Sequence, residues 1–139
     1  MASIRINGFD DVLKMLDKLS DKSHVDNIAK GAVDAAKDIV ASAMSSAIAA
    51  SEHGPKSTGS VAGSIQATAS KINSYGAYSV AKPTGTHPSG KRNAAVAAYL
   101  EYGASNLGAR PWRSRAASSA EPGCMKIIED YVKSEMGAE

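Results

Sequence analysis

Alanine dominates the apolar residues of this chain, and that limits the kind of core the chain can form. The 139 residues include 25 alanines, whereas leucine, isoleucine, valine and phenylalanine together number 23. Few large side chains are therefore available for a core, although the net charge of +2 is too small to cause disorder by repulsion. We expect a single domain over residues 1–139 whose small, closely packed core is completed by neighbouring copies or partners.

The composition argues against several classes of protein. No run of 18 apolar residues occurs, so no membrane span is expected, and the opening residues MASIRINGFDD do not resemble a signal peptide. The single cysteine, Cys124, cannot form an internal disulfide, and the three histidines lie far apart in the sequence. We therefore expect no structural metal and no cofactor.

Helical periodicity appears in three places. The first helix is expected over 10–22, after residues 3–7, which alternate like a short strand. The longest helix is expected over 24–51, with Ser23 as its N-cap and alanine at many positions of its apolar stripe. A C-terminal helix is expected over 121–136, with Pro122 at its first position.

Between these helices the pattern changes to alternation and turns. Residues 61–72 and 77–82 predict a β-hairpin around the turn-like sequence Asn-Ser-Tyr-Gly, and the polar residues 83–93 predict a mobile loop. Residues 94–102 fit either a helix or a strand. The fold class is α+β: a small antiparallel sheet packed against a long Ala-rich helix, a shorter N-terminal helix and a C-terminal helix.

Positive charge is concentrated in residues 82–115. This stretch holds six cationic residues against one acidic residue, Glu101. It is either a solvated loop region or a surface that faces nucleic acid or an acidic neighbour, with Lys82, Lys91 and Arg92 as possible loop contacts.

No pattern in the sequence predicts an active site, so we expect no enzyme. Residues 85–91 fit the phosphate-loop pattern G-x-x-x-x-G-K, but Arg92 stands where a magnesium-binding Ser or Thr is needed. Cys124 lies on an apolar helical stripe with no histidine near it in sequence, which is typical of a buried thiol.

Two segments carry a recognisable family pattern. The first runs from Gly54 to Ile65 and has Pro55, Thr58 and Gly59 at the exit of a helix, ahead of a strand. The second combines Glu101-Tyr102-Gly103 with Arg110-Pro111-Trp112, followed by the C-terminal helix. Together with the opening from Gly8 to Leu16, they resemble the tail-completion, or head–tail joining, family of tailed double-stranded-DNA phages and prophages. Ala104 departs from that pattern, where threonine is usual.

The resemblance implies a non-catalytic structural protein of the virion. It implies a homo-oligomeric ring, usually of six copies, in the neck or at the head-proximal end of the tail, after synthesis in the cytoplasm of a bacterial host. The implied partners are the connector or stopper and the tail-tube proteins, with DNA passing through the lumen. The motif residues would then lie at or near interfaces between subunits.

Alternatives stay open for single residues and for the function. Glu101 is either a solvated charge or the partner of Arg110 or of a basic group on another subunit. Trp112 is either a core anchor or an interface residue, and Thr58-Gly59 sets a turn before the strand. The alternative functions are a small DNA-binding protein that uses residues 82–115 and a nucleotide-binding enzyme that uses residues 85–91.

Overall fold

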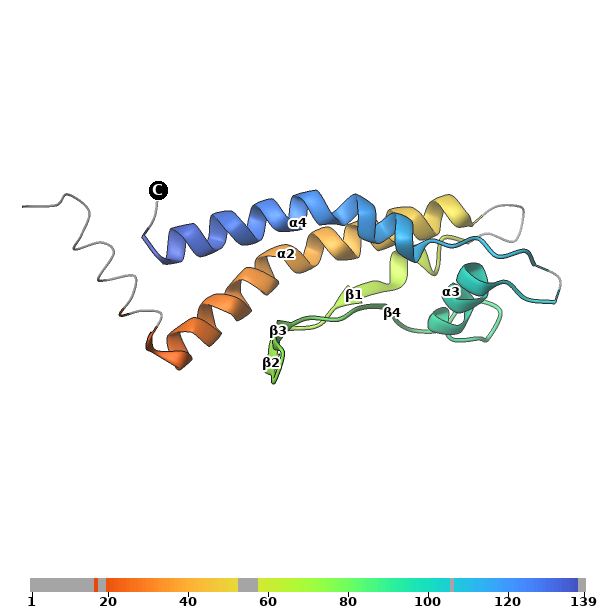
Figure 1. Cartoon of the computed structure of the whole chain (residues 1–139). Coiled ribbons are helices and arrows are strands. Elements are labelled where there is room, and N and C mark those ends of the chain that lie inside the picture. Colours follow the sequence, from red (N-terminus) through yellow and green to blue (C-terminus); the bar gives the residue numbers. More distant parts are fainter. Residues whose placement is uncertain (1–16, 18–19, 53–57, 106, 138–139) are drawn as a thin grey trace, which may run out of the picture.

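The chain folds as an α+β structure in which two long helices run beside a β-hairpin arm (Figure 1). This computed structural model describes residues 17, 20–52, 58–105 and 107–137. The expected strand over 3–7 and most of the expected helix over 10–22 lie outside the described residues. The elements in chain order are helix α2 (Lys22–Ser51), the 3-10 turn η1 (Ala62–Ser64), strands β1 (Ile65–Ala67), β2 (Lys71–Asn73), β3 (Gly76–Tyr78) and β4 (Ala81–Pro83), and helices α3 (Asn93–Tyr102) and α4 (Arg113–Glu135).

Helix α2 confirms the expected long Ala-rich helix within two residues. Its N-cap is Asp21 rather than Ser23, because the Asp21 carboxylate accepts the amide hydrogens of Ser23 and His24 at 3.0 and 3.4 Å. This bond satisfies donors in the first turn that have no partner within the helix.

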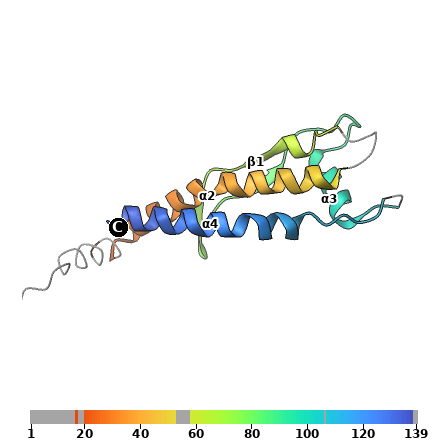
Figure 2. The ribbon, with the colours of Figure 1, turned by 90° about the horizontal axis from the view of Figure 1, so that it is seen from above.

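Helix α4 begins at Arg113, eight residues before the expected start, so the prediction that placed Pro122 at the first helical position is wrong. Pro122 lies in the helix interior. Helices α2 and α4 lie side by side along most of their length (Figures 1 and 2). This packing, together with the capping of α4 described below, keeps the helix continuous despite the amide hydrogen that proline lacks.

Small residues let α2 and α4 approach closely. Ile39 would lie 3.5 Å from a Cβ at Gly123, and the phenol ring of Tyr131 lies where a Cβ at Gly31 would be. The Sγ of Cys124 lies 3.7 Å from the Ala36 carbonyl oxygen, so this thiol packs against the neighbouring helix.

The predicted hairpin is confirmed as a long arm built from two short ladders. At the tip, β2 pairs with β3 antiparallel, with Asn73 opposite Gly76; nearer the body, β1 pairs with β4, with Ile65 opposite Pro83. Between the ladders, the Thr68 amide donates to the Val80 carbonyl at 2.9 Å. The expected strand start at residue 61 is wrong, because residues 62–64 form η1 instead.

A carboxylate of α2 ties this arm to the helix through the buried Ser70. Asp34 accepts hydrogen bonds from the Ser70 hydroxyl at 2.7 Å and from the Ser70 amide at 3.0 Å. These bonds, with the nearby ammonium of Lys37, hold the pKa of Asp34 below its ordinary value. The carboxylate is therefore charged at neutral pH and fixes the arm midway along the helix.

Residues 94–102 form helix α3, which decides between the two structures expected there. The preceding loop is closed by backbone hydrogen bonds, with Thr86 bridged to Arg92 and the Asn93 amide donating to Gly85 at 3.0 Å. Asn93 is 3% exposed, and its side-chain amide donates to the Thr84 carbonyl at 2.7 Å. The predicted mobility of residues 83–93 stays a prediction.

The largest buried cluster is small and lies where α2, α3 and the start of α4 meet. It consists of Ile48, Val61, Ala97, Leu100 and Trp112. Towards the far end of α2 and α4, most buried apolar residues are alanines. The core therefore secures one end of the molecule far better than the other.

The two glycines of the α2–α4 interface provide a matched test of this packing. Gly123→Ala should raise the free energy of unfolding by about 0.5–1 kcal/mol, because alanine favours helix and its methyl group meets Ile39 at normal contact distance. Gly31→Ala should lower it by about 1–3 kcal/mol, since the ring of Tyr131 must move. Urea unfolding of both variants measures the difference, and equal effects would contradict this register.

Candidate functional site

The two parts of the second motif meet where α3 passes into α4, and we call Glu101, Arg110, Pro111 and Trp112 the α3–α4 joint. Glu101 lies near the end of α3, and its Oε2 accepts the amide hydrogens of Trp112 at 2.7 Å and Arg113 at 3.1 Å. These amides begin α4 and have no partner within the helix. A carboxylate here also interacts favourably with the helix dipole, so Glu101 caps α4 from a different helix.

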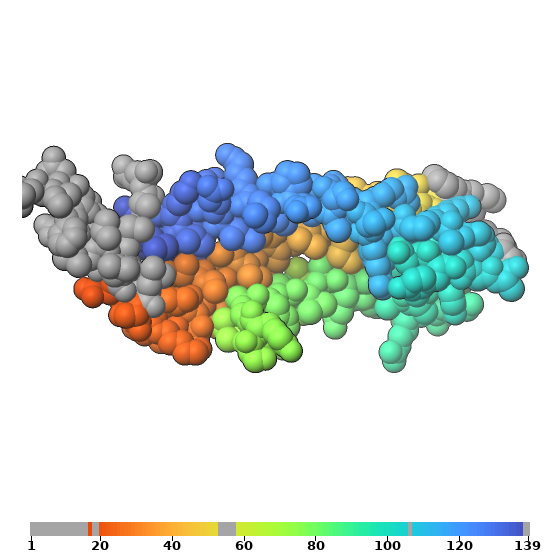
Figure 3. Space-filling model, in the orientation of Figure 1, coloured from red at the N-terminus to blue at the C-terminus, as the bar shows by residue number. Residues whose placement is uncertain are grey.

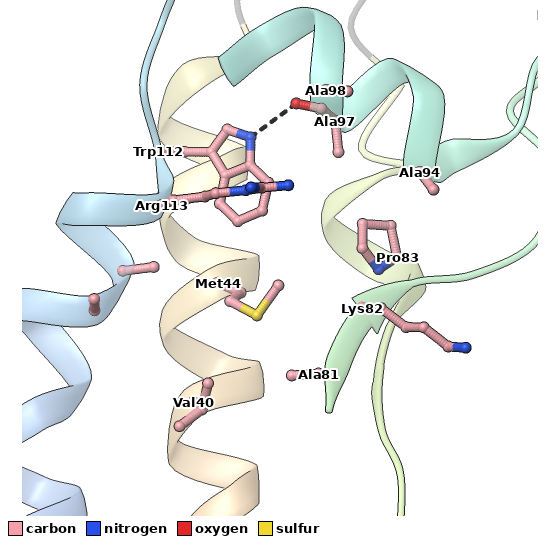
Figure 4. A pocket seen from close by; sticks show the side chains of 12 residues that line it. Val40, Met44, Ala81, Lys82, Pro83, Ala94, Ala97, Ala98, Trp112 and Arg113 are labelled. Carbon is pink, nitrogen blue, oxygen red and sulfur yellow. Dashed lines mark hydrogen bonds between the residues drawn. The ribbon is translucent and has the colours of Figure 1, made fainter. Parts of the chain in front are cut away.

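Trp112 anchors the joint in the core. Its side chain is 3% exposed, and its indole Nε1 donates to the Ala97 carbonyl at 2.9 Å (Figure 4). The ring thus joins the start of α4 to the middle of α3. Of the two roles considered for Trp112, the structure places it as a core anchor.

Arg110 reaches away from Glu101, towards the end of α2. Its Nη1 donates to the carbonyl of Ser51 at 2.9 Å, while its own amide donates to Leu100 at 2.6 Å. The nearby Arg115 donates to the Ser51 hydroxyl at 2.7 Å. No ion pair joins Glu101 to Arg110 in the described part of the chain, so of the alternatives left open for Glu101, the pairing with Arg110 is not found. The carboxylate binds amides, and the guanidinium binds the carbonyl end of a helix.

The residues after Glu101 form the sharp turn that makes this geometry possible. Gly103 has a φ of 85°, and a Cβ there would lie 3.0 Å from the backbone atoms Ala109 N and Leu107 O. Glycine is therefore required at this position for both conformation and space. Tyr102 is 69% exposed, and its hydroxyl accepts a hydrogen bond from Arg113 at 3.1 Å.

The first motif forms a turn, as expected, beside the loop before α3. Gly59 has a φ of 73°, and the Thr58 hydroxyl accepts the Ser60 amide at 3.3 Å. Thr58 Oγ1 also lies 3.5 Å from His87 Nε2. Pro55 lies outside the described residues.

The cationic residues predicted as a cluster do lie at one end of the molecule, around the joint and α3. Several of them have partners there: Lys91 lies 5.0 Å from the centre of the Tyr99 ring, and Arg113 lies 5.6 Å from the rings of Tyr102 and Trp112. Lys82 and Arg92 are exposed. The six residues of this basic end are Lys82, Lys91, Arg92, Arg110, Arg113 and Arg115.

An apolar groove lies between the hairpin arm and the two long helices (Figures 3 and 4). Its larger part, about 450 Å³, is bounded by Val40, Met44, Pro83 and Trp112 together with several alanines. Its smaller part, about 250 Å³, continues from Val40 past Tyr78, Cys124 and Ile128. The sequence did not predict this groove. Alanine leaves space only where neighbouring backbone does not pack against it, and that depends on the tertiary structure.

The geometry does not support the nucleotide-binding alternative. In the loop that fits the phosphate-loop pattern, the His87 amide donates to the Lys91 carbonyl and the Gly90 amide donates to His87. These amides are therefore turned inward and are unavailable for phosphate oxygens.

The described ranges contain neither a candidate metal site nor a candidate membrane span. No group of three or more His, Cys, Asp or Glu side chains is placed to hold a metal ion there. Nor is any helix of those ranges long and apolar enough to cross a membrane.

Burial raises the pKa of the Cys124 thiol, which is the opposite of what activates a nucleophile.

Comparison of the chain with protein-family models, with curated proteins and with solved structures gave no match.

The joint predicts that removing one carboxylate uncouples α3 from α4. Glu101→Ala should lower the free energy of unfolding by about 1–2 kcal/mol, the range for a lost helix cap. Glu129→Ala is the matched control, because Glu129 makes only a surface pair with Lys133 and should change stability little. Urea unfolding of both variants measures this, and equal losses would contradict the capping role.

Proposed function

We propose that this chain is a non-catalytic structural protein of a tailed phage virion, which forms a ring joining the head to the tail. The two motif segments support the family assignment through their resemblance to tail-completion proteins. The observation that carries the proposal is the separation of charge along the molecule, because it fits repeated association of one chain with copies of itself.

The two ends of the molecule carry opposite charge. The basic end has six cationic side chains and two carboxylates, Glu101 and Glu52. Both carboxylates already accept amide hydrogens, two at Glu101 Oε2 in the joint and one, from Gly59 at 3.3 Å, at Glu52 Oε2. The opposite end comprises residues 21–40 and 121–135, with five lysines and eight carboxylates, and we call it the acidic end. Four of those lysines pair with carboxylates on their own helix, which leaves an excess of negative charge.

Opposite charge at two different surfaces favours head-to-tail association. The basic end of one copy attracts the acidic end of the next, and such an interface uses a different patch on each partner. Interfaces of this kind close into a ring when a whole number of the rotations that relate neighbouring copies adds up to a full turn. The sixfold number is an implication of the family resemblance.

The small core supports the same proposal. Only ten hydrophobic residues are buried among those described, and five of these are alanines. Apolar surface stays exposed in the groove and on the arm, where Val80 is 45% exposed. Contacts with neighbouring copies would bury this surface and supply stability that the isolated chain lacks.

In such a ring, the loops of the basic end would contact the layers above and below or line the channel. Lys82, Lys91 and Arg92 are exposed in this region. They would face either an acidic surface of the connector or tail tube, or the phosphates of DNA in the lumen.

Assembly of the purified chain tests the proposal. Light-scattering mass over a concentration series should rise from monomer to a closed species of about six copies, with rings in negative-stain images. The mass should fall as salt is raised from about 0.05 to 0.5 M, because screening weakens attraction between exposed charges. A chain that stays monomeric at every concentration and salt would contradict self-assembly into a ring.

A second candidate is a DNA-binding protein that uses the basic end. Its support is that Lys82, Lys91 and Arg92 lie at the same end as three arginines. Against it, Arg110 and Arg115 bind the end of α2, and Arg113 stacks on two aromatic rings. Tight duplex binding with a steep salt dependence, lost in the Lys82→Ala/Arg92→Ala variant, would favour this candidate.

A further inference from the structure

We propose that the apolar groove binds the N-terminal segment, residues 8–20, of a second copy of this chain. This inference rests on the proposed function, because it names the contact through which neighbouring copies of the ring hold one another. The partner is identified by its chemistry: an amphipathic segment with large apolar side chains on one face and acidic residues beside them.

The groove is suited to a helix with an apolar stripe. Its two parts adjoin at Val40 and Ala81, which line both of them beneath the arm. Val40 is 36% exposed in its wall, and Tyr78 is 39% exposed beside it. An amphipathic helix that lies in such a groove buries its apolar face against these side chains.

The N-terminal segment is rich in large apolar side chains. It contains the only phenylalanine of the chain and three of its five leucines. They recur at the spacing of one helical face, so a helix over this segment carries a single apolar stripe. The stripe consists of Phe9, Val12, Leu13, Leu16 and Leu19.

Charge complements this fit. Asp10 and Asp17 border one side of the stripe in the expected helix, with Lys14 between them, and residues 8–20 carry three aspartates against two lysines. The groove carries cations at its edge on two elements, Lys82 on β4 and Arg113 on α4; Lys37 also lines it but pairs with a carboxylate of its own helix. Acidic residues beside an apolar stripe would therefore meet basic residues beside an apolar groove.

Length favours a second copy over the segment of the same chain. At 1.5 Å per residue, Val40 and Met44 lie about 27 and 33 Å along α2 from Lys22. A helix over residues 10–20 that folds back from the start of α2 extends only about 17 Å. Its stripe would stop short of the larger part of the groove, whereas the stripe of another copy has no such limit.

The contact also agrees with the polarity of the charges. The segment is attached to α2 at the acidic end, while the larger part of the groove lies beside the basic end. Binding between copies therefore joins an acidic end to a basic end, as head-to-tail association requires.

Cys124 provides a direct test, since it lines the groove and is the one cysteine of the chain. The full chain carrying Leu13→Cys is oxidised with copper phenanthroline and run on a non-reducing gel. Each chain then has one cysteine in the segment and one in the groove, so linkage between copies should give a ladder well beyond dimers, and peptide mapping of its bands should find residue 13 joined to residue 124. The same chain with Cys124→Ala should stop at dimers, because only the two introduced cysteines can then join.

A second pair of variants tests the contact without cross-linking. Val40→Glu places a carboxylate in the groove. Met125→Glu replaces an apolar residue of α4 that is 63% exposed and lies outside the groove, so it is the control. Light scattering should show that Val40→Glu needs at least tenfold higher concentration to assemble, while Met125→Glu stays within twofold of the unmodified chain.

The outcomes separate this inference from the ring itself. Two results together would overturn the groove contact and leave the proposed function standing. They are normal ring formation by the Val40→Glu variant and no ladder from the Leu13→Cys chain. A disulfide between residues 13 and 124 found only within monomers would also overturn it, because the segment would then fill its own groove. A ladder from open chains without closed rings would support the contact and contradict the ring.

Discussion

The structure depends on one carboxylate near the end of α3 that caps the start of α4. Glu101 at the end of α3 accepts the first amide hydrogens of α4, and this bond allows α4 to start at Arg113. Trp112, held between these elements, then enters the core and donates to Ala97. Arg110 in the same turn binds the last carbonyl of α2. The joint therefore fixes three helices relative to one another, although the largest buried cluster contains only five residues.

Away from the joint, the molecule is held by small residues and local polar contacts. Glycine and alanine allow α2 and α4 to pack closely, and Asp34 fixes the arm to α2 through Ser70. The same small side chains leave a groove under the arm, because alanine does not fill the space between it and the helices. An arrangement with one well-packed end, one charged open end and an apolar groove suits a subunit that is completed by its neighbours.

The sequence predicted the elements whose signals are local. The periodicity of α2, the hairpin turn before Gly76 and the turn at Gly59 all depend on neighbouring residues, and each was located correctly. The start of α4 could not be found in this way, because its cap is a side chain eleven residues earlier on another helix. Pro122 was a misleading local signal, since packing against α2 overrides it. For the same reason, none of the alternatives for Glu101 included the helix start that its side chain binds.

The central claim is that copies associate through oppositely charged ends, and an exchange of charges tests it most directly. One variant carries Lys82→Glu, Lys91→Glu and Arg92→Glu at the basic end, and another carries Asp38→Lys and Glu121→Lys at the acidic end; all five positions are exposed. Each variant alone is expected to form no large species in light scattering, because like charges then meet at every interface. A chain carrying all five changes should assemble again, since the attraction is restored with its direction reversed. Assembly of the single-end variants, or failure of the combined one, would contradict head-to-tail association.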